Sequence, residues 1–495
     1  MKPKTIKNKT MNFSLFKYVP FFFLLLSLGC EKDFEEINRN PNQPDAVPEN
    51  MLLTQIIFNT AEFNANRAYN QGNFITQHTA KQNFTDFDRY AWGPESGVWN
   101  NMYDRIRDIN NMIELARENN SVNYEGIGYV WRAFCFASLT DVYGDIPFTE
   151  AILGRDEGVY SPAYDPQEVV YEGIMEDLKR ANETLDPSGI PIEGDIFYGN
   201  DVMKWRKMAN SLRLRYLMRI SNVKDVSADM AEILTNPGDF PIFESLEDQA
   251  ALTYLASAPN QWFTHTGRAG SFAERRMSAT IQTRFENLND PRVSAYFRPT
   301  EAYADGDTNV QYLGVPNGLG EAEALDWNGG SRFQSRLDQK YFEEPNSAEA
   351  IVMTYFELQF ILAEAAERGL IGGSAQAYYE EGVRSALRYY DVEEADIDAY
   401  MAQTEVSLSN GEPMEKILLQ KWIGNFMVGF EGWCDWRRTG LPDFEPAISD
   451  DNNNRVPVRF IYPQSEQSLN ATNRAQAIAR QGPDDINTRI WWMGN

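Results

Sequence analysis

The feature that most constrains this chain is a set of apolar stripes with helical spacing that come in pairs. Within each stripe the apolar residues recur every three or four positions, which indicates amphipathic helices that each bury one face. Alanines at several contact positions favour close antiparallel packing of each pair. The stripes of the first two pairs run over Trp99–Ala116 with Val130–Thr140, and over Val170–Leu185 with Val202–Ile220.

A third pair and a fourth helix follow in the C-terminal half. The first stripe of the third pair, Tyr355–Ala365, ends before Gly369. Ser374 is expected to cap the second helix, whose stripe covers Tyr379–Tyr390. The further helix holds the stripe Met414–Phe426. Earlier in the chain, Asp165 before a proline and a glutamate is expected to be an N-cap. Paired helices of this kind indicate tetratricopeptide-like hairpins, although no strict 34-residue register is present. We therefore expect a mostly α fold with minor β structure.

Residues 236–350 interrupt this pattern. The segment is rich in Gly, Pro, Asn and aromatic residues, as in Tyr312–Gly318, and holds only short helix or strand candidates. Irregular insertions of this length inside a compact protein are usually functional. We expect this insertion to lie on the ligand side of a single domain over residues 51–495.

The N-terminus has the pattern of a bacterial lipoprotein signal. Five lysines and no acid precede the apolar run Phe21–Leu26, and Cys30 follows Gly29. The apolar core is about half of the roughly twenty residues that a membrane-spanning helix needs. We expect residues 1–29 to be removed, Cys30 to carry lipid, and residues 30–50 to form an acidic tether; a plain signal peptide or an anchor that happens to end in Cys is the alternative.

The charge expected of the mature chain disfavours a polyanionic partner. Removal of residues 1–29 leaves 40 basic and 72 acidic residues, a formal charge of −32. Such a surface repels nucleic acid and anionic lipids, so the lipid on Cys30 is the expected membrane contact.

The sequence contains no recognisable catalytic, metal or cofactor motif. Its two histidines, His78 and His265, lack metal-ligand spacing and have no nucleophile motif nearby, and no phosphate-binding glycine loop is present. The Asp450–Asn454 run lacks the glycine and terminal glutamate of a calcium loop. Cys135 and Cys434 are expected to be buried free thiols, with a disulfide between them left open. Because a glycosidase needs only two carboxylates, hydrolysis also stays open.

An ordered set of motifs runs along the mature chain and includes Tyr143–Pro147, Asn210–Arg215, Gly429–Trp433, Asp435–Pro442, Arg459–Pro463 and Trp491-Trp492. This set resembles the SusD/RagB family of nutrient-binding outer-membrane lipoproteins of the Bacteroidetes type. The resemblance implies a cell-surface protein that captures a glycan, or sometimes a peptide, and acts as the lid of a SusC-type TonB-dependent transporter. It implies a binding protein without a cofactor. A surface glycan hydrolase and an adhesive lipoprotein without a small ligand are the alternatives.

Most of the family motifs are expected to be structural. We interpret Trp433, Trp436, Arg437 and Arg438 as part of an acid–arginine network under aromatic packing. The basic residues between Lys204 and Arg219 are likewise expected to pair internally.

Ligand residues are sought in polar loops that carry aromatic residues without helical spacing. Sugars present C–H faces to rings and hydroxyls to planar polar groups. One such loop contains Asp86, Tyr90 and Trp92, and the insertion adds Asn260, Trp262, Arg268, Tyr312 and Trp327. Each ring has a core contact as its alternative role, and neither cluster distinguishes a glycan from a peptide.

Overall fold

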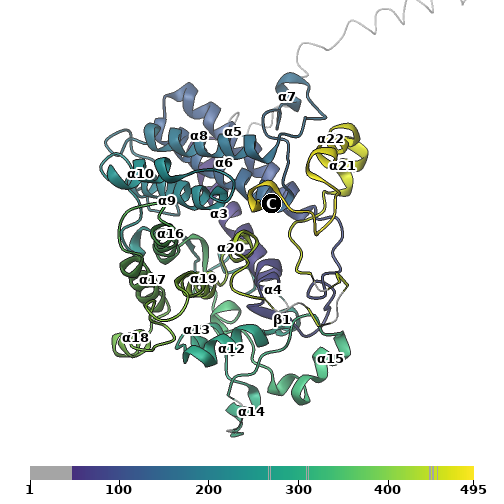
Figure 1. Ribbon diagram of the computed structural model, residues 1–495. Helices are drawn as coiled ribbons and strands as arrows, with labels where there is room; N and C mark the ends of the chain where they lie inside the picture. Colours follow the sequence, from purple (N-terminus) through teal and green to yellow (C-terminus); the bar gives the residue numbers. More distant parts are fainter. Residues whose placement is uncertain are drawn as a thin grey trace, which may run out of the picture. The chain divides into compact units, whose positions relative to one another are not determined.

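Antiparallel helix pairs form the scaffold of the computed structural model, which describes residues 47–494 except 266, 268, 308, 310, 445, 446, 449, 450 and 454 (Figure 1). The first pair is α5 (Gly97–Asn119) and α6 (Val122–Tyr143), which reverse direction at Asn120 in the left-handed region. Gly128 lets the two helices approach closely, because a Cβ there would lie 2.5 Å from the Ile113 side chain. The apolar stripe of α5 is buried along its whole length, as its spacing predicts.

The second pair is α8 (Gln167–Thr184) with α9 (Val202–Ile220). Asp201 caps α9 by accepting hydrogen bonds from the backbone N–H groups of Met203 and Lys204. The predicted N-cap at Asp165 is wrong, since helix α8 begins one residue later than expected, after Pro166. The Asp165 carboxylate instead accepts hydrogen bonds from the backbone of Phe148 and Thr149 and so fixes the preceding loop.

The remaining scaffold helices lie around α16 (Tyr355–Glu367). It pairs with α17 (Ala375–Tyr389), which Ser374 caps as predicted, and packs against α19 (Pro413–Gly424). Phe426 lies just beyond α19 and not in it, because that helix ends at Gly424. The other helical segments here are α3 (Glu49–Arg67), its π-helical continuation η1 (Ala68–Gly72), α4 (Asn73–Ile75), α18 (Glu394–Met401) and α20 (Glu431–Thr439).

The 236–350 segment consists of short elements, which occupy the lower part of Figure 1. Two antiparallel strand pairs hold it to the scaffold: β1 (Thr79–Lys81) with β3 (Arg275–Met277), and β2 (Ala250–Thr253) with β4 (Glu349–Met353). Its helical pieces are η2 (Leu246–Asp248), α11 (Ala269–Ala273), α12 (Ala279–Leu288), α13 (Val293–Tyr296), α14 (Glu301–Ala304), α15 (Glu321–Asp326), η3 (Trp327–Gly329), η4 (Ser331–Phe333) and η5 (Gln339–Tyr341). Elsewhere lie α7 (Gly154–Glu157), α10 (Ser227–Thr235), α21 (Gln464–Leu469), α22 (Ala471–Gln481) and η6 (Trp491–Met493).

Buried ion pairs join the helices at the centre of the scaffold. Arg215 on α9 binds Glu357 on α16, with its Nε 2.8 Å from Oε1. Arg219 binds Asp141 and Glu431, and Arg438 on α20 binds Glu364 on α16. Arg437 lies over the Trp433 ring, 3.9 Å from its centroid. The predicted internal network is therefore confirmed for Arg437 and Arg438 of the C-terminal motif. The predicted internal pairing of the basic segment is confirmed for Arg215 and Arg219.

The fold class is confirmed as mostly α-helical with small sheets. From Glu49 to Asn495 the chain forms one compact unit, and Cys30 lies outside the described residues. Cys135 and Cys434 are buried free thiols, as expected. Among the described helices, none combines the length and apolar character needed to cross a bilayer.

Candidate ligand-binding site

The loop over residues 82–96, between β1 and α5, has an unusual backbone. Phe84 and Tyr90 both adopt left-handed conformations, with φ of 55° and 64°. This region disfavours bulky side chains, and residues held in such conformations cluster at ligand-binding and active sites. The loop is therefore the first place to seek a site.

The base of this loop is fixed by buried contacts. The Asp88 carboxylate accepts a hydrogen bond of 2.6 Å from the backbone N–H of Lys81, and burial raises the pKa of Asp88 to about 7. The half-buried Trp92 ring stacks on Phe87 at 4.8 Å and meets Trp433 edge to face at 6.0 Å. Tyr90 is buried beside Trp92. Tyr90 and Trp92 thus tie the loop to helix α20.

Phe84 points away from this base. Phe84 exposes 67 % of its surface, although the burial of so large an apolar ring is favourable. Asp86 is also exposed, two residues farther on. The loop therefore presents a ring and a carboxylate to solvent.

Two other segments flank the loop. The side-chain amide of Asn317 donates a hydrogen bond of 2.8 Å to the Thr79 carbonyl. The backbone carbonyl of Asn317 accepts a hydrogen bond of 3.2 Å from the backbone N–H of Ile448. Arg89 pairs with Asp451 at 3.1 Å. The described residues of the three segments 82–96, 314–333 and 443–458 define what we name the loop site.

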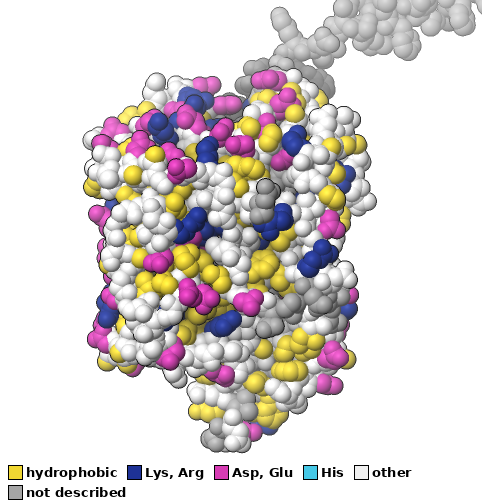
Figure 2. Space-filling view, in the orientation of Figure 1, with side chains coloured by type: hydrophobic (Ala, Val, Ile, Leu, Met, Phe, Trp, Pro, Cys, Tyr) yellow, Lys and Arg dark blue, Asp and Glu magenta, His cyan; other side chains and the backbone are white. Residues whose placement is uncertain are grey.

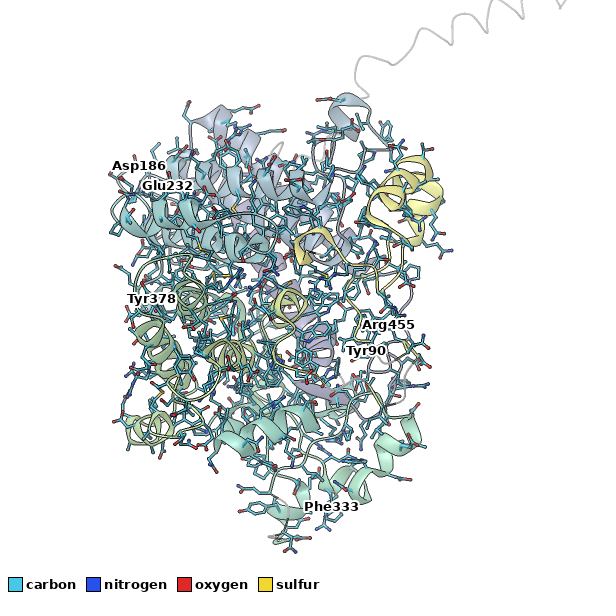
Figure 3. All side chains as sticks on the ribbon, viewed as in Figure 1. Tyr90, Asp186, Glu232, Phe333, Tyr378 and Arg455 are labelled. Carbon is cyan, nitrogen blue, oxygen red and sulfur yellow. The ribbon has the colours of Figure 1, made fainter. Side chains whose placement is uncertain are left out.

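The loop site carries exposed apolar side chains besides Phe84. Ile448 is 62 % exposed and Leu325 is 37 % exposed. Figure 2 shows hydrophobic side chains gathered at the lower right of the view, around α15. Figure 3 shows Tyr90 and Arg455 in the same part of the molecule, with Phe333 at its lower end. A surface of this kind offers apolar contact beside polar loop groups.

Trp327 belongs to this surface and Tyr312 lies at its margin. The half-buried Trp327 packs against a small cluster of Ala80, Val315, Leu319 and Ala324, and its Nε1 donates to the Gly314 carbonyl at 3.1 Å. Tyr312 is half-buried against the main core, and burial raises its pKa. The structure thus brings Trp327 to the same side as the 82–96 loop.

The other predicted residues of the insertion are not brought to this surface. Trp262 is fully buried, donates a hydrogen bond of 2.9 Å to the Tyr341 carbonyl and contacts Tyr254 and Phe263, so its predicted stacking on a ligand is corrected to a core role. Asn260 lines a separate hollow of about 360 Å³ beside helix α3. Arg268 lies outside the described residues.

Two residues of the loop site escaped prediction from sequence. Phe84 belongs to the aromatic run of the predicted ligand loop. The sequence does not distinguish its exposed ring from the neighbouring rings that are covered. Ile448 lies in a polar C-terminal loop with no periodic pattern. The left-handed backbone of Phe84 and the exposure of both residues appear only in three dimensions.

No group of three or more His, Cys, Asp or Glu among the described residues could hold a metal ion. His78 is buried between Thr76 and the Trp422 carbonyl, and burial lowers its pKa to about 3. The arrangement at the loop site suits contact with a ligand, because a ring face binds C–H groups and polar loop atoms bind hydroxyls.

Comparison with known proteins gives a consistent match along the chain. A SusD-like family model, described as "Starch-binding associating with outer membrane", matches residues 41–463. A SusD homologue from Bacteroides fragilis is 29 % identical with a TM-score of 0.80, covering 90 % of this chain and 99 % of its own. A chitin-binding protein is 26 % identical with a TM-score of 0.78, covering 90 % and 99 %. A chitin-binding SusD homologue from Flavobacterium johnsoniae, 23 % identical with a TM-score of 0.75 and covering 89 % and 99 %, shares the fold. A search of curated proteins gave no match.

Proposed function

The chain belongs to the SusD-like family, described as starch-binding and associating with the outer membrane, and from this membership we propose that it captures an oligosaccharide at the loop site for uptake. Lipid on Cys30 holds the protein at the outer face of the outer membrane. A SusC-type TonB-dependent transporter is its partner, and the protein covers the transporter as a lid and delivers the ligand to it.

The observation that carries the binding proposal is the exposure of Phe84 on a strained loop with a fixed base. A ring held in this way loses little conformational freedom when a ligand stacks on it, which favours binding. Asp86 and the half-buried Trp327 supply a hydroxyl acceptor and a second ring edge on the same surface. Tyr90 and Trp92 hold the base of the loop, and Tyr312 lies at the margin of the surface.

Chitin oligosaccharides are the first ligands to test. A chitin-binding protein is among the similar structures, and N-acetylglucosamine presents both an apolar face and hydrogen-bonding groups. Starch oligosaccharides come second because of the family description, and peptides are the alternative class.

Calorimetric titration of the purified mature protein with such oligosaccharides tests the proposal. Phe84→Ala is expected to weaken binding about thirtyfold, since aromatic anchors at a binding centre contribute about 2 kcal/mol. Tyr160→Ala is the matched control, because Tyr160 is 81 % exposed but lies outside the loop site. Equal affinity in both variants would place the ligand elsewhere, and release of shorter oligosaccharides during incubation would favour the hydrolase alternative.

A further inference from the structure

A polar face built from three chain segments borders the loop site. Arg276 of strand β3 is paired with Ala80 of β1 on one side and with Arg336 on the other. Residues that face one another in paired strands, and those two positions farther along, point to the same side of the sheet. The shared side therefore carries Gln82, Arg276, Gln334 and Arg336. We name it the Arg276 face.

Arg276 is a buried guanidinium without a counter-ion. It is 1 % exposed, and its Nη2 donates a hydrogen bond of 2.6 Å to Oε1 of Gln82. Among the described residues, none accepts a hydrogen bond from its Nε or Nη1, and no carboxylate lies within 4.0 Å of it. Glu301 pairs with Arg336 instead, at 2.6 Å. Burial and the neighbouring Arg336 charge lower the pKa of Arg276 to about 10, as expected where a buried charge lacks compensation.

Gln334 supplies the opposite kind of unpaired group. It is also 1 % exposed, and its Nε2 donates to the backbone carbonyls of Ala324 at 2.9 Å and of Trp327 at 3.1 Å. Because both neighbours are carbonyls, the amide nitrogen must face them and the orientation of the amide is fixed. Within the described part of the chain, no group donates to its Oε1. Buried polar atoms are normally paired, so two free donors and one free acceptor on a single face point to a ligand.

We propose that Arg276 and Gln334 recognise the acetamido group of an N-acetylated sugar bound at the loop site. An acetamido group combines one carbonyl acceptor with one N–H donor. The Arg276 guanidinium donates to the carbonyl oxygen, and Oε1 of Gln334 accepts from the N–H. A carboxylate has no hydrogen to give Gln334, and an ammonium group is repelled by the guanidinium. The recognition rests on the proposed function, because Phe84 and Trp327 hold the sugar rings at that surface.

The turn Trp327–Phe333 closes the Arg276 face. The Trp327 carbonyl contacts Gln334 at one end of the turn, and the Ser331 hydroxyl accepts a hydrogen bond from Gln82 near the other. Left-handed residues lie between these contacts, with φ of 51° at Asn328, 94° at Gly329 and 101° at Gly330. Glycines absorb backbone changes at hinges, so the turn moves aside as the acetamido group enters and the Ser331 link breaks.

The donor is tested by calorimetric titration of the full mature protein with two neutral hexamers. One is the N-acetylglucosamine hexamer, and the other is cellohexaose, which has the same linkage and a hydroxyl in place of each acetamido group. Arg276→Gln should weaken binding of the acetylated hexamer about tenfold and leave that of cellohexaose unchanged. Its melting temperature should be unchanged or higher, because an uncompensated buried charge is removed. Arg384→Gln is the control, since Arg384 pairs with Asp398 on the surface.

Two further titrations test the acceptor and the turn. A hexamer with O-acetyl in place of N-acetyl groups keeps the carbonyl and lacks the N–H, so it should bind the wild type about fivefold more weakly than the N-acetyl hexamer. Ser331→Ala removes the link that closes the Arg276 face and should strengthen binding of the N-acetyl hexamer about fivefold. Equal binding of the O-acetyl hexamer would contradict the role of Gln334, and weaker binding by Ser331→Ala would contradict the opening of the turn.

Acetamido recognition and the loop site fail in different ways. Equal affinity of the wild type for the N-acetyl hexamer and cellohexaose, with both weakened by Phe84→Ala, would overturn the recognition and leave the loop site standing. A galacturonate hexamer that binds more tightly than the N-acetyl hexamer, and loses this advantage in Arg276→Gln, would assign the guanidinium to an acidic sugar instead. If Phe84→Ala binds every hexamer as the wild type does, the loop site fails, whereas a preference for N-acetyl groups that disappears in Arg276→Gln would still support the recognition.

Discussion

Phe84 and Trp262 are both loop aromatics, and their surroundings give them different roles. Phe84 is largely exposed, whereas Trp262 is enclosed by Tyr254, Phe263 and Tyr341 and donates its indole N–H to a backbone carbonyl. A buried ring stabilises the fold through packing, and an exposed ring is available to a ligand. Trp92 is intermediate, because one of its faces is covered by Phe87.

Truncation of Trp262 should therefore affect stability and not binding. Trp262→Ala removes a fully buried ring and is expected to lower the free energy of unfolding by about 3–5 kcal/mol. Thermal or denaturant unfolding measures this loss, and calorimetry on the folded variant should give an unchanged affinity for oligosaccharides. An unchanged melting temperature with lost binding would return Trp262 to the ligand site.

At the residue scale, the sequence predicts which loops carry unusual side chains better than it predicts which of those side chains are exposed. The aromatic run at 83–92 points to a loop that carries an exposed ring, because unpatterned aromatics in a polar segment need an explanation. Whether each ring is buried depends on distant segments, such as the Trp433 that covers Trp92. Single-sequence reasoning has no access to those contacts.

At the scale of elements, helix α20 joins the scaffold through charge. Burial alone would raise the pKa of Glu364 on α16, but Arg438 of α20 and Lys421 of α19 outweigh it and hold this pKa below its ordinary value. Asp435 on α20 is affected in the same way by Lys421 and Arg438. Both carboxyls release their protons more readily in the folded protein than in the unfolded chain.

This difference predicts how stability changes with pH. A carboxyl with a lowered pKa in the folded state contributes stability above its unfolded pKa of about 4, and that contribution is lost as the pH falls through the folded value. Arg438→Leu leaves Glu364 buried without its main partner, which should cost about 3–5 kcal/mol at pH 7. Because an unpaired buried carboxyl has a raised pKa, the penalty should shrink toward pH 4.

Chemical denaturation at pH 7 and at pH 4 measures both effects. Arg384→Leu is the control, since Arg384 pairs with Asp398 on the surface and such pairs contribute about 0–1 kcal/mol. A penalty for Arg438→Leu that is equal at the two pH values would contradict the assignment of the cost to the Glu364 charge.

The helical elements could be predicted because burial of one face imposes a period on the sequence. Helices α5, α8 and α17 follow such a period, whereas their partners α6, α9 and α16 are buried on almost all sides. The insertion could not be predicted in detail, since its elements are three to ten residues long and are fixed by contacts such as the β1–β3 pairing across the chain. Asp165 shows the same limit, because a distant loop uses the carboxylate that the local pattern assigns to a cap.

At the scale of the whole molecule, the proposed anchor and the acidic surface set where the protein works. A mature charge of −32 is repelled by anionic membrane surfaces, so the lipid alone would hold the chain at the bilayer. The large binding partner proposed for it lies in the same membrane. Anchor and partnership can therefore be tested together.

Cys30→Ala is expected to abolish labelling by lipid precursors and to release the protein from the outer membrane or leave its signal uncut. Crosslinking of intact cells followed by mild detergent extraction should recover the wild type with a channel protein of much greater mass, and the variant without it. Protease added to intact cells should degrade the wild type. Recovery of the wild type alone would contradict the transporter partnership, and protection from protease would contradict surface exposure.

The buried ion pairs also determine how this protein can be divided. Arg215 and Glu357 are 142 positions apart, Arg219 and Asp141 are 78 apart, and Arg438 and Glu364 are 74 apart. A fragment that contains one member of a pair without the other carries an uncompensated charge in its interior, which is strongly destabilising. The proposed binding surface therefore cannot be excised as an autonomous piece, and altered ligand preference is best sought by exchanging the 82–96 and 314–333 loops on the intact scaffold.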